Sequence, residues 1–303
     1  MRDEHLQSLI TADDPVAVAW DALWELWSET PETAADHYSK TRETAAVDLE
    51  WRLYRVYEEL FTEVLPERCV SRPALSVPDD GALVVMDAAS VREAALFVEA
   101  LVDAGYETHV DYDYATVPSE TTPFRERVGY DALRREYEST KVSTTEPTLR
   151  GDERVVWAPY PDTLVESIQE GKTEKATPAE AYEKTEHALV QILSELDTDR
   201  VVIRSDHGYT RLASGLGFPA SEDVQNRLQD VFSGGRSVGV GELDETALAT
   251  AESLADDGVV AEADGWFAPV GRFTWPARGK YSTYQHGGVG LTEVLTPKIT
   301  VER

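Results

Sequence analysis

The chain has 303 residues, with 57 acidic and 28 basic side chains and a formal net charge of −29. It is nevertheless 42% hydrophobic and contains 7 tryptophans, so it can bury a core and is not a disordered acidic tail. The negative charge argues against generic binding to duplex nucleic acid or anionic lipid, and a single cysteine, Cys69, excludes an internal disulfide.

The composition also bears on the setting of the protein. An acidic, lysine-poor chain is typical of proteins that work in molar salt, where self-repulsion is screened, so we expect a halophilic source. No apolar stretch approaches the ~20 residues of a membrane span. The N-terminus lacks a basic segment followed by an apolar one, so no secretion signal is expected. We therefore expect a cytoplasmic protein without a membrane partner.

The first region, residues 1–78, has a helical pattern with few strand signals. Three tryptophans and five aliphatic residues recur at helical spacing: Trp20, Trp24, Trp27, Leu49, Leu53, Val56, Leu60 and Val64. The aromatic stripe could bind a partner, but such a stripe is more often the core of a helical hairpin. Residues 71–81 are rich in Pro, Asp and Gly and predict a linker to a second region, residues 79–303.

In the second region strand and helix patterns alternate. The expected strands cover residues 82–86, 106–110, 155–157, 201–204, 259–261, 266–270 and 299–301. The expected helices cover residues 90–104, 122–137, 163–170, 178–196 and 245–255, and residues 139–151 are expected to be a surface loop. This alternation predicts an α/β fold, with a mostly parallel central sheet and helices on both faces.

Polar side chains follow three of these strands. Asp87 comes after residues 82–86, and the pair Asp206 and His207 follows residues 201–204. Asp162 and Glu166 come after residues 155–157. Open α/β sheets bind ligands at the carboxyl ends of their strands, and carboxylate with imidazole suits a divalent metal such as zinc or manganese. Asp87 and Asp162 could instead cap the helices that follow them.

Two further segments supply partners for these side chains. Residues 117–123 form a hydroxyl-rich loop that contains Ser119 and Thr121, and His286 precedes two glycines near the C-terminus. Either hydroxyl could be a nucleophile, although Thr121 could also be a helix N-cap. His207 and His286 are each followed by glycine in a loop, which is unlike a packed core histidine.

The order Asp87, Thr121, Asp162, Asp206, His207 and His286 resembles the alkaline phosphatase superfamily. Residues 118–123 are similar to the nucleophile loop of its nucleotide pyrophosphatase/phosphodiesterase branch, and residues 286–297 are similar to the ending of PglZ domains. The resemblance covers roughly residues 80–303 and implies an alkaline phosphatase-like sheet. It also implies two metal ions, with Zn²⁺ expected first and Mn²⁺ or Mg²⁺ as alternatives.

The resemblance assigns roles to the residues. One metal would be held by Asp87, Thr121, Asp206 and His207, and the other by Asp162, Glu166 and His286. Thr121 would be the nucleophile of a metal-dependent phosphoesterase, in the first place a phosphodiesterase, whose substrate could be a nucleotide. A metal lowers the pKa of such a hydroxyl, so no separate general base is required.

One departure from the family pattern leaves a second interpretation open. The family has histidine where this chain has Glu166, and a carboxylate there favours manganese or magnesium over zinc. The chain could therefore be a non-catalytic PglZ-like module with a degenerate metal site and a protein partner in phage defence or signalling. Arg204 and Lys280 are weaker candidates for substrate contact, and the glycine-rich residues 234–241 are expected to be a turn.

Overall fold

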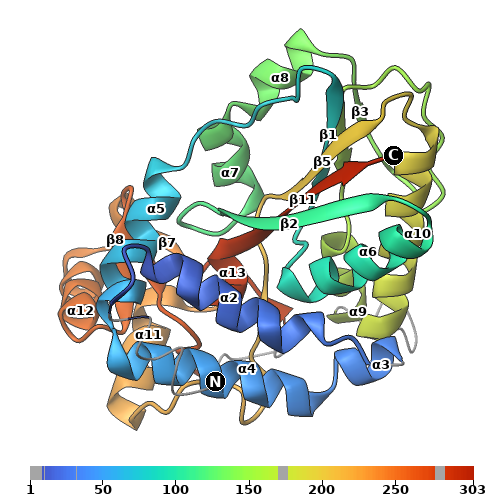
Figure 1. Ribbon diagram of the computed structural model, residues 1–303. Coiled ribbons are helices and arrows are strands. Elements are labelled where there is room, and N and C mark those ends of the chain that lie inside the picture. Colours follow the sequence, from blue (N-terminus) through green and yellow to red (C-terminus); the bar gives the residue numbers. More distant parts are fainter. Residues whose placement is uncertain (1–8, 10, 32, 170–176, 277–283) are drawn as a thin grey trace.

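The computed structural model describes residues 9, 11–31, 33–169, 177–276 and 284–303, so Lys280 lies outside the described residues. Helices and strands alternate along most of this length (Figure 1). The helices are α2 (Pro15–Ser28), α3 (Ala34–His37), α4 (Lys40–Val56), the π-helix η1 (Leu60–Val64), α5 (Leu65–Ser71), α6 (Val91–Asp103), α7 (Thr121–Val128), α8 (Tyr130–Glu136), α9 (Asp162–Gln169), α10 (Pro178–Glu195), α11 (Glu222–Phe232), the 3₁₀ turn η2 (Val240–Glu242), α12 (Glu245–Asp256) and α13 (Leu291–Val294). The strands are β1 (Gly81–Met86), β2 (Glu107–Tyr114), β3 (Ser139–Lys141), β4 (Val155–Ala158), β5 (Arg200–Ser205), β6 (Thr210–Arg211), β7 (Val238–Gly239), β8 (Val260–Ala263), β9 (Trp266–Pro269), β10 (Tyr284–Gln285) and β11 (Leu295–Glu302).

The central sheet has six strands in the order β2-β11-β5-β1-β4-β3. Strand β1 is parallel to both β4 and β5, and β3 is parallel to β4. Strand β11 alone among the six runs against its neighbours, β2 and β5. The predicted mostly parallel sheet is therefore confirmed. Every residue of β1 is buried, as expected for a central strand that is covered on both faces.

Helices cover both faces of this sheet. Alternate residues of β1 point to opposite faces, so the side chains of this strand pack against helices on each side. Val84 packs in one core cluster with Phe97 of α6 and Leu189 of α10. Val85 packs in another cluster with Phe124 of α7. The predicted two-sided covering is confirmed.

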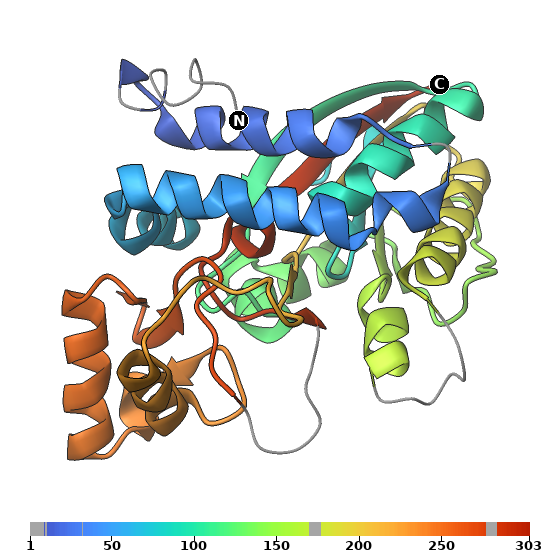
Figure 2. The ribbon, with the colours of Figure 1, turned by 90° about the horizontal axis from the view of Figure 1, so that it is seen from below.

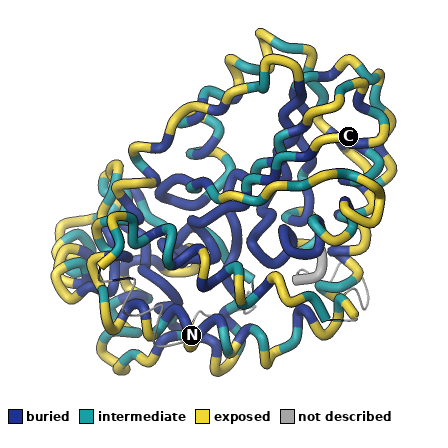
Figure 3. Tube along the Cα trace, in the orientation of Figure 1, coloured by how far each residue is buried: buried dark blue, intermediate teal, exposed yellow. Residues whose placement is uncertain are grey.

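The N-terminal helices pack on the rest of the molecule. Helices α2 and α4 lie side by side in Figure 2 and contact each other. Trp20 and Trp27 are buried, so the tryptophan stripe is core rather than an exposed surface. Val56, expected in the same core, is 47% exposed because α4 ends at this residue. Buried residues of α2 and α4 share one core cluster with Leu295 at the start of β11, and Figure 3 marks the buried residues along the chain.

Three expectations about local structure were wrong. Residues 122–137 do not form one helix, because Gly129 has a φ of 72° and this left-handed residue separates α7 from α8. Residues 139–141 form the edge strand β3 rather than a loop. Strands β8 and β9 do not join the central sheet but form a separate antiparallel sheet with β7, near α11 and α12 in Figure 1. None of the described helices combines the length and apolar character needed to cross a bilayer.

Candidate metal centre

The register of the sheet brings Asp87 and Asp206 together. Met86 pairs with Ser205 at the ends of β1 and β5, so the residues that follow leave neighbouring strands at the same level. Asp206 is fully buried and Asp87 is 7% exposed. The oxygen Asp206 Oδ1 accepts hydrogen bonds from the backbone N–H groups of Ala88 and His207, each at 2.9 Å. These two bonds fix the carboxylate and leave Oδ2 facing the site.

The hydroxyl of Thr121 lies at the centre of a compact group of acceptors. Its Oγ1 is 2.7 Å from Asp206 Oδ2, 3.2 Å from Asp87 Oδ1 and 3.3 Å from His207 Nε2. One hydroxyl proton can satisfy only one of these three acceptors. Asp87, Asp206 and His207 each place a ligand atom within 4.8 Å of the others. The site thus contains more hydrogen-bond acceptors than protons to share among them. Two carboxylates, an imidazole and a hydroxyl are also groups that can coordinate a divalent cation.

The two site histidines are oriented by backbone carbonyls. The Nδ1 atom of His207 lies 2.9 Å from the carbonyl of Gly208, and Nδ1 of His286 lies 3.3 Å from that of Ser119. A carbonyl can only accept, so Nδ1 carries the proton in each ring and Nε2 keeps its lone pair for a metal. The two rings stack with centroids 4.4 Å apart, which brings His286 beside the first group although 79 positions separate it from His207.

Glycine is required after each histidine for a different reason. A Cβ at Gly208 would lie 2.2 Å from the carbonyl oxygen of Thr292, so only glycine allows α13 to approach. Gly287 has a φ of +110°, a backbone conformation that residues other than glycine rarely adopt. The glycines that marked these segments in the sequence thus have a structural cause.

Helix capping does not account for Asp87 or Thr121. The helix after β1 is capped by Ser90, whose hydroxyl accepts from the N–H of Arg92. Glu120 is the N-cap of α7 and makes no side-chain capping bond. Thr121 is the first residue of α7, and its hydroxyl donates into the site instead.

Ser119 has a different environment from Thr121. Its fully buried hydroxyl donates to the carbonyl of Gly288 at 2.9 Å and accepts from the N–H of Gly287 at 2.8 Å. These bonds join the Thr121 loop to the loop that carries His286. Ser119 therefore connects the two loops, and its hydroxyl makes both of these bonds to the loop that carries His286.

Burial without a counter-charge shifts the ionisation of the site. Burial raises the pKa of Asp87, and the nearby Asp206 raises it further. Burial also raises the pKa of Asp206 and lowers that of His207. The pKa of Asp162 rises to about 8 through burial and the charges of Asp87 and Glu166. Neighbouring carboxylates with raised pKa values are expected at a site where a bound cation would supply the missing positive charge.

The second predicted set lies beside the first. Asp162, Glu166 and His286 line a pocket of about 180 Å³ together with Tyr209 and Tyr284. Asp162 is at the start of α9 and its N–H donates to the carbonyl of Asp87 at 3.2 Å. Among the described residues, only Asp87, Asp206 and His207 place their ligand atoms within 4.8 Å of one another. The ligand atoms of the second set share a pocket but are farther apart.

The structure gives no support to Arg204 as a substrate contact, and the other candidate, Lys280, lies outside the described residues. Arg204 forms an ion pair with Asp113 on β2, and it is absent from the described lining of the pockets at Asp87 and His286. Asp113 also accepts from Arg72 at 2.7 Å. Residues 234–241 contain the expected turn, in which Gly234 and Gly235 line the pocket at His286.

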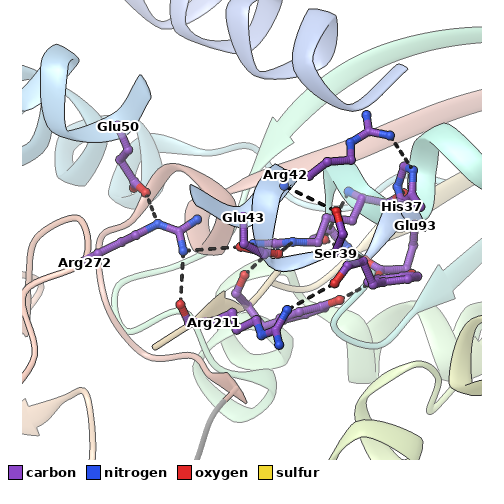
Figure 4. A network of polar contacts seen from close by, with 12 residues as sticks. His37, Ser39, Arg42, Glu43, Glu50, Glu93, Arg211 and Arg272 are labelled. Carbon is purple, nitrogen blue, oxygen red and sulfur yellow. Dashed lines mark hydrogen bonds and ion pairs between the residues drawn. The ribbon is translucent and has the colours of Figure 1, made fainter. Parts of the chain in front are cut away.

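A buried ionic network ties the N-terminal helix α4 to the loops of the site (Figure 4). Glu43 accepts from Arg92 Nε at 2.6 Å and lies 3.5 Å from Arg272 Nη1, and Glu50 accepts from Arg272 Nε at 2.7 Å. Arg92 also donates to the carbonyl of Tyr209, two residues after His207, at 3.0 Å. Glu50 accepts from the N–H of Leu291 at 2.6 Å. Each of these four charged residues is at most 2% exposed.

A second buried pair holds the His286 loop. Glu293 accepts from Arg236 Nε at 3.0 Å and from the N–H of Gly288, also at 3.0 Å. Arg236 donates in turn to the carbonyls of Gly271 and Phe273. Both side chains are fully buried. This pair supports the backbone next to His286 from a segment 50 positions away in the chain.

Sequence reasoning missed several residues at the site. Trp157 of β4 donates from Nε1 to Asp87 Oδ2 at 3.2 Å, and the only signal was a polar-tipped aromatic at the end of an apolar strand. The ionic networks gave no local signal, since Glu43 and Arg272 are 229 positions apart. Arg125, Arg134 and Lys141 line a second pocket next to Thr121, and no motif marked them.

No protein-family model matches the chain, and no curated protein matches it. Two solved structures of phosphonoacetate hydrolase from Sinorhizobium meliloti 1021, in complex with phosphonoformate and with phosphonoacetate, are similar to it at 12% and 10% identity and TM-scores of 0.39 and 0.37. Each similarity covers 74% of this chain and 90% of the other. An inactive variant of murine ectonucleotide pyrophosphatase/phosphodiesterase 5 in complex with AMP is similar at 10% identity and a TM-score of 0.27, over 58% of this chain and 63% of that one.

Proposed function

We propose that the chain is a metal-dependent phosphoesterase, in the first place a phosphodiesterase, with Thr121 as its nucleophile. The observation that carries the proposal is the position of Thr121 Oγ1, within 3.3 Å of Asp206, Asp87 and His207. A hydroxyl at the start of a helix, at the carboxyl edge of a parallel sheet, is open to a ligand from the loop side. Phosphoryl transfer needs a positioned nucleophile and concentrated positive charge more than it needs other covalent chemistry.

The residues divide into two proposed metal sites. Asp87, Thr121, Asp206 and His207 would hold one ion, and Asp162, Glu166 and His286 would hold the other. Bound ions would lower the pKa of the Thr121 hydroxyl and offset charge on the phosphoryl oxygens. Zn²⁺ suits the His207 site best, whereas the extra carboxylate of Glu166 favours Mn²⁺ or Mg²⁺ at the second.

The chain's own groups prepare the nucleophile. Asp206 Oδ2 is the nearest acceptor for the Thr121 hydroxyl proton, at 2.7 Å, and the two backbone bonds to Oδ1 keep that oxygen in place. Ser119 is less suited to attack because its hydroxyl is buried and bonded on both sides. We therefore keep Thr121 as the nucleophile and give Ser119 a positioning role.

A second candidate function is a non-catalytic PglZ-like binding module, with a partner in phage defence or signalling. The exposed position of Glu166, and the looser spacing of its set, favour this alternative. In that case the first site would hold one structural ion and the pocket beside it would bind a ligand without turnover. The acidic surface supports no generic duplex binding in either case.

Metal analysis paired with turnover separates these candidates. The purified protein would be assayed in high salt for Zn, Mn and Mg content and for hydrolysis of bis(para-nitrophenyl) phosphate and para-nitrophenyl phosphate. A phosphodiesterase should bind two ions and hydrolyse the diester faster than the monoester. One ion or none, with no turnover of either ester, would establish the module instead. Faster turnover of the monoester would still support a metal-dependent mechanism but would identify the protein as a phosphomonoesterase.

A further inference from the structure

A second pocket lies next to Thr121, apart from the pocket that contains Glu166. It has a volume of about 50 Å³ and is bounded by Asp87 and Thr121 of the metal centre. Three cationic side chains complete it: Arg125 of α7, Arg134 of α8 and Lys141 of β3. The other pocket contains Asp162 and Glu166, so the metal centre has one acidic side and one basic side.

This basic cluster is unusual in so acidic a chain, which has 57 acidic and only 28 basic residues. Arg125 pairs with the exposed Asp131 at 2.9 Å. Among the described residues, no carboxylate lies within ion-pair distance of Arg134 or Lys141, and both side chains are exposed. Basic residues elsewhere in the chain commonly have acidic partners, such as Arg150 with Glu138. The charge of this cluster is therefore available to a ligand.

Aromatic rings hold part of the cluster in position. Tyr130 and Trp157 meet edge to face with centroids 4.7 Å apart. The guanidinium of Arg125 lies 5.2 Å from the Tyr130 centroid and 5.9 Å from that of Trp157, and Arg134 lies 6.0 Å from Tyr130. Cation–π contacts of this kind orient a guanidinium before a ligand arrives, which lowers the entropic cost of binding.

We propose that this pocket is a subsite for a second oxyanion of the substrate, a group other than the phosphoryl group that reacts at Thr121. Guanidinium and ammonium groups are the side chains that bind phosphate and carboxylate. A volume of about 50 Å³ admits an oxyanion group. The inference rests on the proposed function for the chemistry at Thr121, and it narrows the substrate to compounds with two anionic groups.

The test measures binding rather than turnover. Calorimetry in high salt, at one fixed ionic strength, would compare phosphate, which has one anionic group, with pyrophosphate and phosphonoacetate, which have two. The wild-type, metal-loaded protein should bind at least one of the two-group probes about tenfold more tightly than phosphate. The stronger of the two identifies the second group as a phosphate or a carboxylate.

Two variants then locate the subsite. The double variant R134Q/K141Q should lose most of the tenfold preference, whereas R135Q, at the neighbouring exposed arginine, should keep it. Metal chelation by a probe is the same for all three proteins, so only differences between them are compared. An unchanged preference in R134Q/K141Q, or no preference in the wild type, would overturn the subsite. A preference that is lost in R134Q/K141Q, in a protein without esterase turnover, would support the subsite and reject the proposed function alone.

Discussion

The buried carboxylate of Glu43 offers a test of how the N-terminal helices support the site. We consider Glu43→Gln, which keeps the size of the side chain and removes its charge. In the native protein Glu43 contacts Arg92 through both carboxylate oxygens, at 2.6 and 3.1 Å, and neither side chain is more than 2% exposed. Arg272 would retain Glu50, but Arg92 would lose the carboxylate that neutralises it.

The expected magnitude follows from this asymmetry. Removing one partner of a buried ion pair costs about 3–5 kcal/mol, because the other charge stays buried and uncompensated. We take the lower end, about 3 kcal/mol, because a glutamine oxygen can still accept from Arg92 and Arg92 also donates to the carbonyl of Tyr209. In a chain of this size each 1 kcal/mol shifts Tm by roughly 2 °C, so Tm should fall by roughly 6 °C.

The assay is thermal unfolding followed by circular dichroism, with Glu138→Gln as a matched control. Glu138 also pairs with an arginine, Arg150 at 2.7 Å, but the two side chains are 63% and 61% exposed. Exposed pairs contribute about 0–1 kcal/mol, so the control should shift Tm by no more than roughly 2 °C. Equal shifts in the two variants would refute the idea that burial makes the Glu43 pair matter.

The pH dependence gives an independent check on the same pair. Burial alone would raise the pKa of Glu43, but the charges of Arg92 and Arg272 outweigh it and lower the pKa. A lowered folded-state pKa means that the stabilisation is complete above the unfolded value of about 4.3 and is lost as pH falls through the folded value. The difference in Tm between wild type and Glu43→Gln should therefore be constant near neutral pH and shrink in acid. A difference that grows on acidification would contradict this sign.

The remaining predictions concern the site and its setting. Thr121→Ala should lower turnover of the diester by about 10³-fold or more while metal stays bound, with the exposed neighbour Thr122→Ala as control, and wild-type turnover in Thr121→Ala would exclude it as the nucleophile. Asp206→Ala should remove metal from the first site, measured by elemental analysis, and all activity with it; full activity would exclude the metal mechanism. Glu166→His should bind zinc at least as tightly as wild type by calorimetry, because it supplies a nitrogen donor, and weaker binding would contradict the idea that a histidine can replace Glu166 as a ligand of the second site. If the source is halophilic, Tm should rise with molar potassium chloride as repulsion among the acidic residues is screened, and a Tm that falls would contradict that origin.

Local sequence patterns predicted the elements that carry the site. The apolar run before Asp87 is the fully buried central strand β1, as expected for a strand that is covered on both faces, and the β-branched run before Asp206 lies in the neighbouring strand β5, whose residues alternate between buried and partly exposed. Parallel strands end at a common edge, so the residues that follow them had to approach one another. The structure brings His286 to the same place, with its ring stacked on that of His207, although the catalytic roles of these residues stay predictions.

The sequence by itself determined which segments could bear chemistry, since strand exits, glycine-flanked histidines and a hydroxyl-rich loop are local features. Only the tertiary structure decided which groups share a site and which neutralise each other. Arg204 is only two positions before Asp206 in the sequence but pairs with Asp113 on another strand, and Glu43 of helix α4 pairs with Arg92 and Arg272. Likewise Arg134 and Lys141 meet beside Thr121 only because Gly129 turns the chain between α7 and α8 and β3 adds to the sheet edge. Charges interact through space, and proximity in space is set by strand register and helix packing rather than by position in the chain.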